Sequence, residues 1–160
     1  MRLTTFTDYS LRVLIYLAAQ PGRRATIGDV ANAFDISEHH VAKVVHLLGA
    51  AGFLENVRGR GGGMQLARPP LEINVEEVVR LAEGVDVPAV CFEPGSHGCV
   101  LDGGCRLKGV FGEATDAFYA TLGRYTLEDL VRERVSILKR LITRDGHPPE
   151  APRELASSKR

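Results

Sequence analysis

The chain of 160 residues has few aromatic residues and no long apolar run. It contains no tryptophan and only 6% aromatic residues, so a folded core must consist mainly of aliphatic side chains. No stretch approaches the about 18 consecutive apolar residues that a membrane-spanning helix needs. The first residues also lack the uninterrupted apolar segment of a secretory signal peptide. We therefore expect a cytoplasmic protein with no membrane association.

A net charge is also lacking, and only the distribution of the charges is informative. The 20 basic and 20 acidic residues balance, which excludes a strongly basic protein. Residues 1–70 nevertheless contain eight Lys and Arg against five Asp and Glu, whereas residues 71–160 contain twelve against fifteen. A basic first half is typical of a module that binds a polyanion. Because the excess is small, this indication needs a supporting motif.

The spacing of apolar residues predicts three helices in the first 52 residues. Helical spacing is found over residues 6–19, over 27–34 and from 38 to about 50. Thr26 and Ser37 directly precede the second and third of these segments and are typical N-cap residues. The second and third helices are separated by a tight turn, which is the arrangement of a helix-turn-helix.

Two short strand patterns follow, at residues 53–57 and 64–67, on either side of a tip rich in Gly and Arg. They predict a hairpin. Three helices followed by a hairpin are the order of a winged helix-turn-helix, whose third helix enters the major groove of DNA. Arg side chains between glycines suit a wing that approaches a narrow minor groove. The candidate DNA contacts are Thr26, Ser37, His39, His40 and Lys43 in the helical part and Arg58 and Arg60 in the wing.

The same residues also have a purely structural interpretation. Helix-turn-helix shapes occur in domains that bind no DNA, and His39, His40 and His46 are ordinary polar residues for an exposed helix face. Glu38 would repel phosphate unless its carboxylate accepts a hydrogen bond from a cytosine amino group. DNA binding is favoured because the turn, the wing and the basic excess fall within one module.

The second half of the chain is predicted to be helical on either side of an irregular segment. A fourth helix is expected near 75–83, a long helix from 106 to 123, and a shorter helix after Thr126 as N-cap. Gly, Pro, Ser and charged residues predict a disordered tail at the C-terminus. The fold class expected is mainly α. The predicted parts are a winged helix-turn-helix domain (1–83), a cysteine-bearing loop (84–105), a long helix with a C-terminal helical segment (106–144) and the tail (145–160).

The three cysteines, Cys91, Cys99 and Cys105, lie in this irregular loop with the spacing C-x7-C-x5-C. An odd trio is unusual for disulfides in an intracellular chain, and no Cys-x-x-Cys pair supports a disulfide-exchange enzyme. Three converging thiolates suit zinc or an iron–sulfur cluster, although the spacing differs from the paired knuckles of zinc ribbons. A thiol redox switch and plain buried cysteines are the alternatives.

A cluster or metal ion with three thiolate ligands lacks a fourth ligand. The local candidates are His97, between the first two cysteines, and Asp8, in the first helix. His97 is otherwise explained as a solvated loop residue. Asp8 is otherwise explained as an acidic partner of the positive end of the helix dipole.

Four motifs occur together in this chain. They are Met1-Arg2-Leu3-Thr4 with Thr7-Asp8-Tyr9, the wing from Val57 to Gly63, the three cysteines followed by Arg106-Leu107, and the segment from Tyr125 to Leu130. In this combination the chain resembles the IscR/NsrR/RirA family of bacterial transcription regulators over about residues 1–142. The resemblance implies a homodimer formed through the long helix after the last cysteine. It also implies a palindromic operator in double-stranded DNA, a cluster that tunes the affinity for it, and no enzymatic activity.

Within this family the chain is most similar to the nitric oxide-sensing branch. The similarity lies in Phe6 to Tyr9, in His40 and Lys43, and in the Tyr-Thr-Leu-x-Asp-Leu motif at 125–130. In that branch the aspartate at the position of Asp8 ligates the [4Fe–4S] cluster of the partner subunit. The resemblance therefore implies a repressor of nitrosative-stress genes, with [4Fe–4S] favoured over [2Fe–2S]. The implied ligands are Cys91, Cys99, Cys105 and Asp8.

The first gap between the cysteines departs from that branch. Seven residues separate Cys91 from Cys99, which is longer than the gap common in that branch. A gap of this length resembles an iron-responsive branch of the family. An iron- or redox-responsive regulator that uses the same cluster is therefore the alternative. From a different class, the loop could hold structural zinc in a binding module that senses nothing. The apolar stripe from Leu107 to Leu122 predicts a dimer seam rather than a cofactor pocket.

Overall fold

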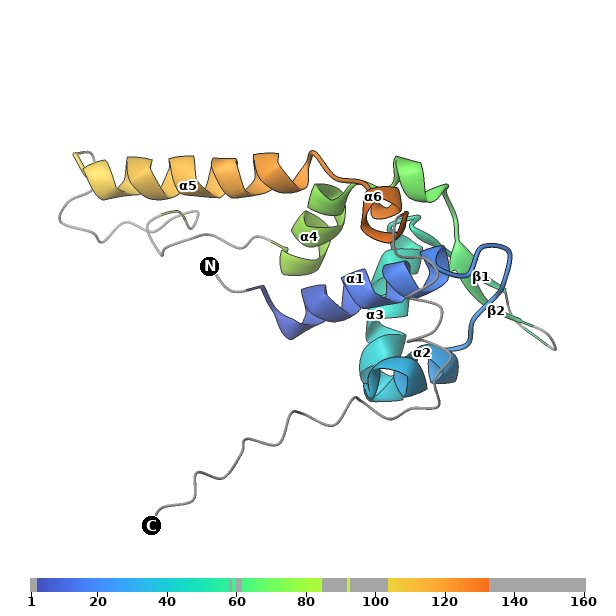
Figure 1. Ribbon diagram of the computed structural model, residues 1–160. Helices are drawn as coiled ribbons and strands as arrows, with labels where there is room; N and C mark the ends of the chain where they lie inside the picture. Colours follow the sequence, from blue (N-terminus) through green and yellow to red (C-terminus); the bar gives the residue numbers. More distant parts are fainter. Residues whose placement is uncertain (1–2, 58, 60–61, 85–91, 93–103, 133–160) are drawn as a thin grey trace, which may run out of the picture.

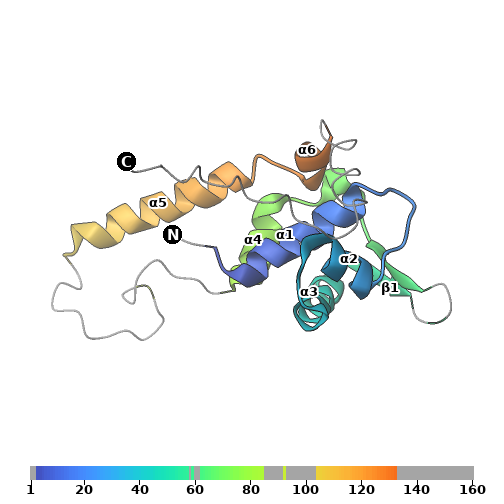
Figure 2. The same ribbon diagram turned by 60° about the horizontal axis from the view of Figure 1, so that its bottom comes forward.

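The computed structural model describes residues 3–57, 59, 62–84, 92 and 104–132. Within these residues the order of elements is three helices, a two-stranded hairpin, a short 3-10 turn and three further helices. Helix α5 extends away from the body formed by the other elements in both views (Figures 1 and 2). None of the helices in the described ranges is long and apolar enough to cross a membrane. The tail predicted for 145–160 lies outside the described residues.

The first three helices form the helix-turn-helix. They are α1 (Thr5–Ala18), α2 (Ile27–Phe34) and α3 (Glu38–Ala50). Their bounds agree with the ranges predicted from apolar spacing to within about one residue at each end. Figure 2 shows α1 lying across α2 and α3, so that one long helix supports both helices of the turn.

Local capping explains where α2 begins and ends. The Thr26 hydroxyl accepts a hydrogen bond from the backbone N–H of Asp29 at 3.1 Å, and the Asp29 carboxylate accepts one from the Thr26 N–H at 2.7 Å. This reciprocal pair satisfies two N–H groups that the first turn leaves without partners. The helix ends at Asp35, whose φ of 53° is left-handed, a conformation that aspartate tolerates. Ser37 stands at the N-cap of α3, as predicted, but its side chain makes no capping hydrogen bond.

The main core is aliphatic, as the composition predicts. One face of α3 contributes Val41, Val44, Val45 and Leu48, and all four are buried. They pack in one cluster with residues of α1 such as Leu14. Because these positions follow the helical period, the opposite face of α3 is left for solvent or a ligand.

The wing is an antiparallel hairpin of β1 (Leu54–Val57) and β2 (Gly63–Leu66). Its base is extended by Ala25, which exchanges backbone hydrogen bonds with Met64 at 3.0 and 2.7 Å. This exchange attaches the wing to the segment before α2. Gly63 is required there: its φ is +150°, and a Cβ atom would lie 2.8 Å from the carbonyl oxygen of Ala25.

The remaining helices return the chain to the same body. After a 3-10 turn (Pro70–Glu72) come α4 (Val75–Glu83), α5 (Arg106–Leu122) and α6 (Leu127–Val131). The bounds of α4 are those predicted, and Thr126 caps α6 as expected. The side chains of Leu127 and Val131 belong to the main core, so α6 is part of the winged-helix body.

Helix α5 joins the body only near its C-terminal end within the described residues. There Tyr119 forms a small second cluster with Val75 and Val79 of α4. Toward its N-terminal end the helix carries apolar side chains that remain exposed, namely Leu107, Val110 and Phe111.

Candidate nucleic-acid interface and metal ligands

The start of α3 presents an exposed polar face. Ser37, His39, His40 and Lys43 are all exposed, whereas the valines one position away on the helix are buried. The sequence predicts that these four residues contact DNA. The structure leaves each of them accessible, at the N-cap or on the first turns of α3. Their contacts with bases remain a prediction.

Glu38, which would repel phosphate from this face, is turned toward α2. Its Oε1 atom lies 3.3 Å from the position that a Cβ atom on Gly28 would take. Gly28 is in the first turn of α2, where the helix dipole is positive and stabilises a carboxylate. The Glu38 carboxylate is therefore placed beside the start of α2. Thr26 is exposed at the same end of α2, and its hydroxyl hydrogen remains available to a phosphate.

Arg24 is a basic residue at this surface that the sequence analysis did not single out. Its Nε donates a hydrogen bond to Oε1 of Gln65 on β2 at 3.2 Å, and Nε2 of Gln65 donates to Glu55 on β1 at 2.9 Å. These bonds hold an exposed guanidinium at the base of the wing. The sequence could have indicated Arg24 only through its position directly before Ala25. The pairing of Ala25 with the wing is not predictable from local spacing.

Several predicted site residues lie outside the part of the chain that the structure describes. They are Arg58, Arg60, Cys91, His97 and Cys99.

Of the predicted metal ligands, Cys105 and Asp8 are described. Cys105 is the partly exposed residue before α5, and its side chain makes no capping hydrogen bond. Asp8 is in the first turn of α1, with its side chain 49% exposed and Oδ2 2.8 Å from Nη2 of Arg12. The starts of α1 and α5 lie apart in both views (Figures 1 and 2). Within the described residues no three His, Cys, Asp or Glu side chains are gathered as a metal site.

A carboxylate that sequence reasoning missed, Glu83, holds the start of α1. Its Oε1 atom accepts hydrogen bonds from the Thr4 N–H at 2.8 Å, from the Thr4 hydroxyl at 3.1 Å, and from the Thr7 hydroxyl. Partial burial alone would raise the pKa of Glu83, but these hydrogen bonds outweigh it and the pKa lies below its ordinary value. Glu83 is the last residue of α4. Its hydrogen bonds therefore hold the first turn of α1, which carries Asp8, against the end of α4.

We expect Glu83→Ala to lower the free energy of unfolding by about 2 kcal/mol, because the fully buried Thr7 hydroxyl loses a charged acceptor. Glu83→Gln should cost less, since the amide oxygen still accepts. The carboxylate contributes stability above the ordinary glutamate pKa of about 4.3, and this contribution is lost as the pH falls through the lowered pKa. Urea unfolding of metal-free protein across this acidic range should therefore show a larger acid loss for the wild type than for Glu83→Gln. Equal pH profiles would contradict the assignment.

The geometry defines a winged helix-turn-helix protein with an exposed polar recognition face. The chain belongs to the Rrf2 family of iron-dependent transcriptional regulators, whose sequence profile matches residues 3–133. It is 46% identical over 142 residues to the HTH-type transcriptional regulator NsrR of Bacillus subtilis (strain 168), which covers 88% of this chain and 97% of that relative. It is 44% identical over 147 residues to the regulator of the same name from Geobacillus kaustophilus (strain HTA426), with 91% and 100% covered.

Solved structures show the same fold. CymR (YrzC), the global cysteine regulator of B. subtilis, matches with a TM-score of 0.67 and 28% identity over 83% of this chain and 98% of that chain. IscR of T. potens matches with a TM-score of 0.66 and 22% identity over 83% and 88%. These comparisons confirm the predicted fold class and the prediction of an NsrR-like regulator. The relatives are regulators rather than enzymes, which agrees with the sequence analysis.

Proposed function

We propose that the chain forms a homodimer that binds a palindromic operator, represses transcription there, and releases the DNA when nitric oxide reaches an iron–sulfur cluster. The observation that carries this proposal is the position of Asp8. Its carboxylate is exposed one residue before Tyr9, whose ring lies 6.0 Å from that of His40 on α3. A candidate cluster ligand is therefore next to a contact with the recognition helix. The identity to NsrR regulators supports nitric oxide as the signal.

Three thiolates and one carboxylate are the proposed ligands of the cluster, [4Fe–4S] in preference to [2Fe–2S]. Thiolates are the usual ligands of iron–sulfur clusters, and Cys105 fits because its side chain is accessible and free of a capping bond. Since the starts of α1 and α5 lie apart within one chain, Asp8 is proposed to act on the partner subunit's cluster (Figure 1). When bound, the cluster supplies iron that reacts with nitric oxide. The proposed ligands are Cys91, Cys99, Cys105 and Asp8.

Arg12 gives the Asp8 carboxylate a second partner. The two side chains form an ion pair at 2.8 Å within one helix. If Asp8 holds the cluster of the partner subunit, Arg12 would be the cation that pairs with its carboxylate when the carboxylate is not bound to iron. We infer that a shift of the first turn of α1 reaches the DNA-reading face through the contact of Tyr9 with His40.

The exposed apolar side chains of α5 are proposed to form the dimer seam. Leu107 and Val110 are more than half exposed, and Phe111 is 37% exposed. A second α5 would cover them and place two recognition helices on one duplex, where successive major grooves are about 34–36 Å apart. Arg58 and Arg60 would then contact the DNA backbone or minor groove beside each half-site.

The test is anaerobic purification followed by an absorption spectrum and titration with nitric oxide in the presence of DNA selected from a random library. A brown protein that binds the selected DNA and releases it on titration is the expected result. A colourless protein with stoichiometric zinc would reject the cluster and favour a structural zinc module. A brown protein that keeps its DNA at several equivalents of nitric oxide would reject nitric oxide as the signal but would leave the cluster in place.

The second candidate signal is iron or redox state. It is favoured by the seven-residue gap between Cys91 and Cys99, which resembles an iron-responsive branch. In the same assay, release of DNA on addition of an iron chelator or of oxygen, without a response to nitric oxide, would support this candidate.

A further inference from the structure

The C-terminal end of α5 and the residue that follows it contact α4 through five residues. We define the joint as Asn74, Glu76, Arg80, Tyr119 and Gly123. We propose that the joint fixes the direction of α5 relative to the winged-helix body and thereby determines which half-site spacing the dimer accepts. This inference rests on the proposed function, because it assumes that α5 forms the dimer seam.

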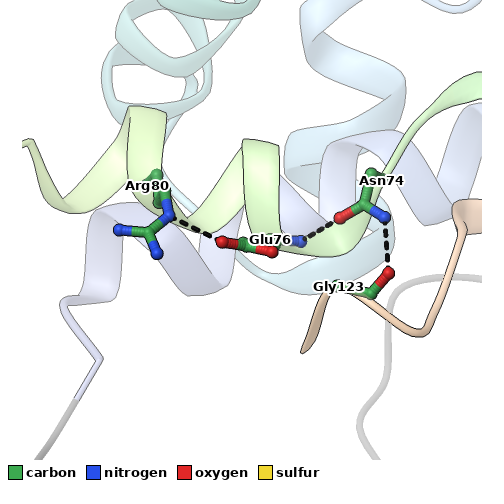
Figure 3. Close-up of polar contacts among 4 residues, drawn as sticks. All are labelled: Asn74, Glu76, Arg80 and Gly123. Carbon is green, nitrogen blue, oxygen red and sulfur yellow. Dashed lines mark hydrogen bonds and ion pairs between the residues drawn. The ribbon is translucent and has the colours of Figure 1, made fainter. Parts of the chain in front are cut away.

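The first layer of the joint is a cap shared by two segments. The Asn74 side chain accepts a hydrogen bond from the Glu76 N–H at 2.8 Å and donates one to the Gly123 carbonyl at 2.9 Å (Figure 3). One amide therefore begins α4 and secures the end of α5. Two backbone hydrogen bonds join the same two segments. The Val75 N–H donates to the Tyr125 carbonyl at 3.0 Å, and the Leu127 N–H donates to the Ile73 carbonyl at 2.8 Å.

The second layer holds the last turn of α5 itself. The Arg80 guanidinium lies 3.7 Å from the centre of the Tyr119 ring. Figure 3 shows the ion pair on its other side, in which Arg80 Nε lies 2.8 Å from Oε1 of Glu76. Tyr119 is only 4% exposed and packs on α4. The burial of the ring against α4 and the cation–π contact together hold the last turn of α5 on α4.

Gly123 completes the joint because it brings the backbone directly against the Glu76 carboxylate. Its φ of −63° is an ordinary helical value, so backbone conformation does not require glycine. A Cβ atom would, however, lie 2.5 Å from Oε2 of Glu76 and 3.5 Å from the Tyr119 carbonyl. An alanine here therefore requires the end of the flexible Glu76 side chain to shift from the position in which it pairs with Arg80.

The length of α5 turns a small change at the joint into a large one at the dimer seam. Seventeen residues span about 25 Å, and the exposed Leu107 and Val110 lie toward the end away from the joint. A tilt of about 10° therefore moves that end by roughly 4 Å, whereas one base pair along DNA is roughly 3.4 Å. The stiffness of the joint thus decides whether the dimer distinguishes operators that differ by one base pair in spacing.

The experiment is parallel selection of random double-stranded DNA by the cluster-loaded dimers of the wild type, Gly123→Ala, Glu76→Gln and Glu77→Gln. Glu77 is the matched control: it neighbours Glu76 in the first turn of α4 but pairs with Arg68, outside the joint. The readout is the distance between half-sites in the enriched DNA. Small-angle scattering of the free dimers reports the arrangement of the bodies without DNA.

The wild type and Glu77→Gln should enrich one spacing about tenfold over its neighbours. Gly123→Ala and Glu76→Gln should enrich the same half-site sequence with that preference reduced to about threefold or less, together with a changed scattering profile. Unchanged spacing and scattering in folded dimers of both variants would overturn the proposal. Should Gly123→Ala fail to fold, Glu76→Gln alone decides the outcome. A wild type that forms no dimer or enriches no two-half-site DNA would instead reject the proposed function.

Discussion

The cluster-loaded Asp8→Ala protein should bind its operator about a hundredfold more weakly than the wild type while keeping three-thiolate attachment of the cluster. A hundredfold loss corresponds to about 2.7 kcal/mol, a plausible contribution of one ligand that joins two subunits. The absorption spectrum should shift, because water or another external donor replaces the carboxylate. Both quantities are measured anaerobically, by spectroscopy and by fluorescence anisotropy with labelled operator DNA.

Arg12→Gln is the matched control for this substitution. It breaks the 2.8 Å ion pair with Asp8 but leaves the carboxylate in place, so its spectrum should equal that of the wild type. If Asp8 only pairs with Arg12 and complements the helix dipole, both variants should lose about 1 kcal/mol of stability or less. Unaltered spectrum and operator affinity in Asp8→Ala would then remove Asp8 from the set of ligands.

Gly63→Ala should destabilise the protein by about 3 kcal/mol, because it combines an unfavourable backbone conformation with a steric clash. The φ of +150° disfavours any side chain, and the new Cβ atom would lie 2.8 Å from the oxygen and 3.2 Å from the carbon of the Ala25 carbonyl. Since both are backbone atoms, a rotamer change cannot relieve the clash. The pairing of Ala25 with Met64 should be lost, and operator affinity should fall by about tenfold or more as the wing is displaced.

Gly52→Ala is the control for a positive φ without a steric clash. Gly52 also has a positive φ, +76°, but a Cβ atom there would meet nothing within 4 Å. Its substitution should therefore cost only about 1 kcal/mol, from backbone strain. Urea unfolding gives the stability of both variants, and anisotropy gives their affinity for DNA. Equal losses for the two variants would show that the contact of Gly63 with Ala25 contributes nothing.

The extent of each early helix and the exposed face of α3 could be predicted from sequence because their causes are local. Thr26 and Asp29 are three residues apart, and their reciprocal hydrogen bonds fix the start of α2 wherever the helix packs. The buried face of α3, with Val41 and Leu48, follows the helical period, so the complementary polar face was predictable as well. The motifs of the family were likewise visible in the order of the residues.

The contacts that position these elements were decided only by the tertiary structure. Glu83 meets Thr4 across 79 residues, and Asn74 meets Gly123 across 49. No sequence pattern predicts either contact. The residues around a carboxylate or amide that caps a helix do not show whether its partner is near or far in the chain. The return of Leu127 to the core beside α1 is equally non-local, because it depends on the path of the chain after α5. By itself, the sequence determined which elements form and which faces they expose, since propensity, capping and period act within a few residues. Their mutual placement arose only when packing brought distant polar groups within hydrogen-bonding distance.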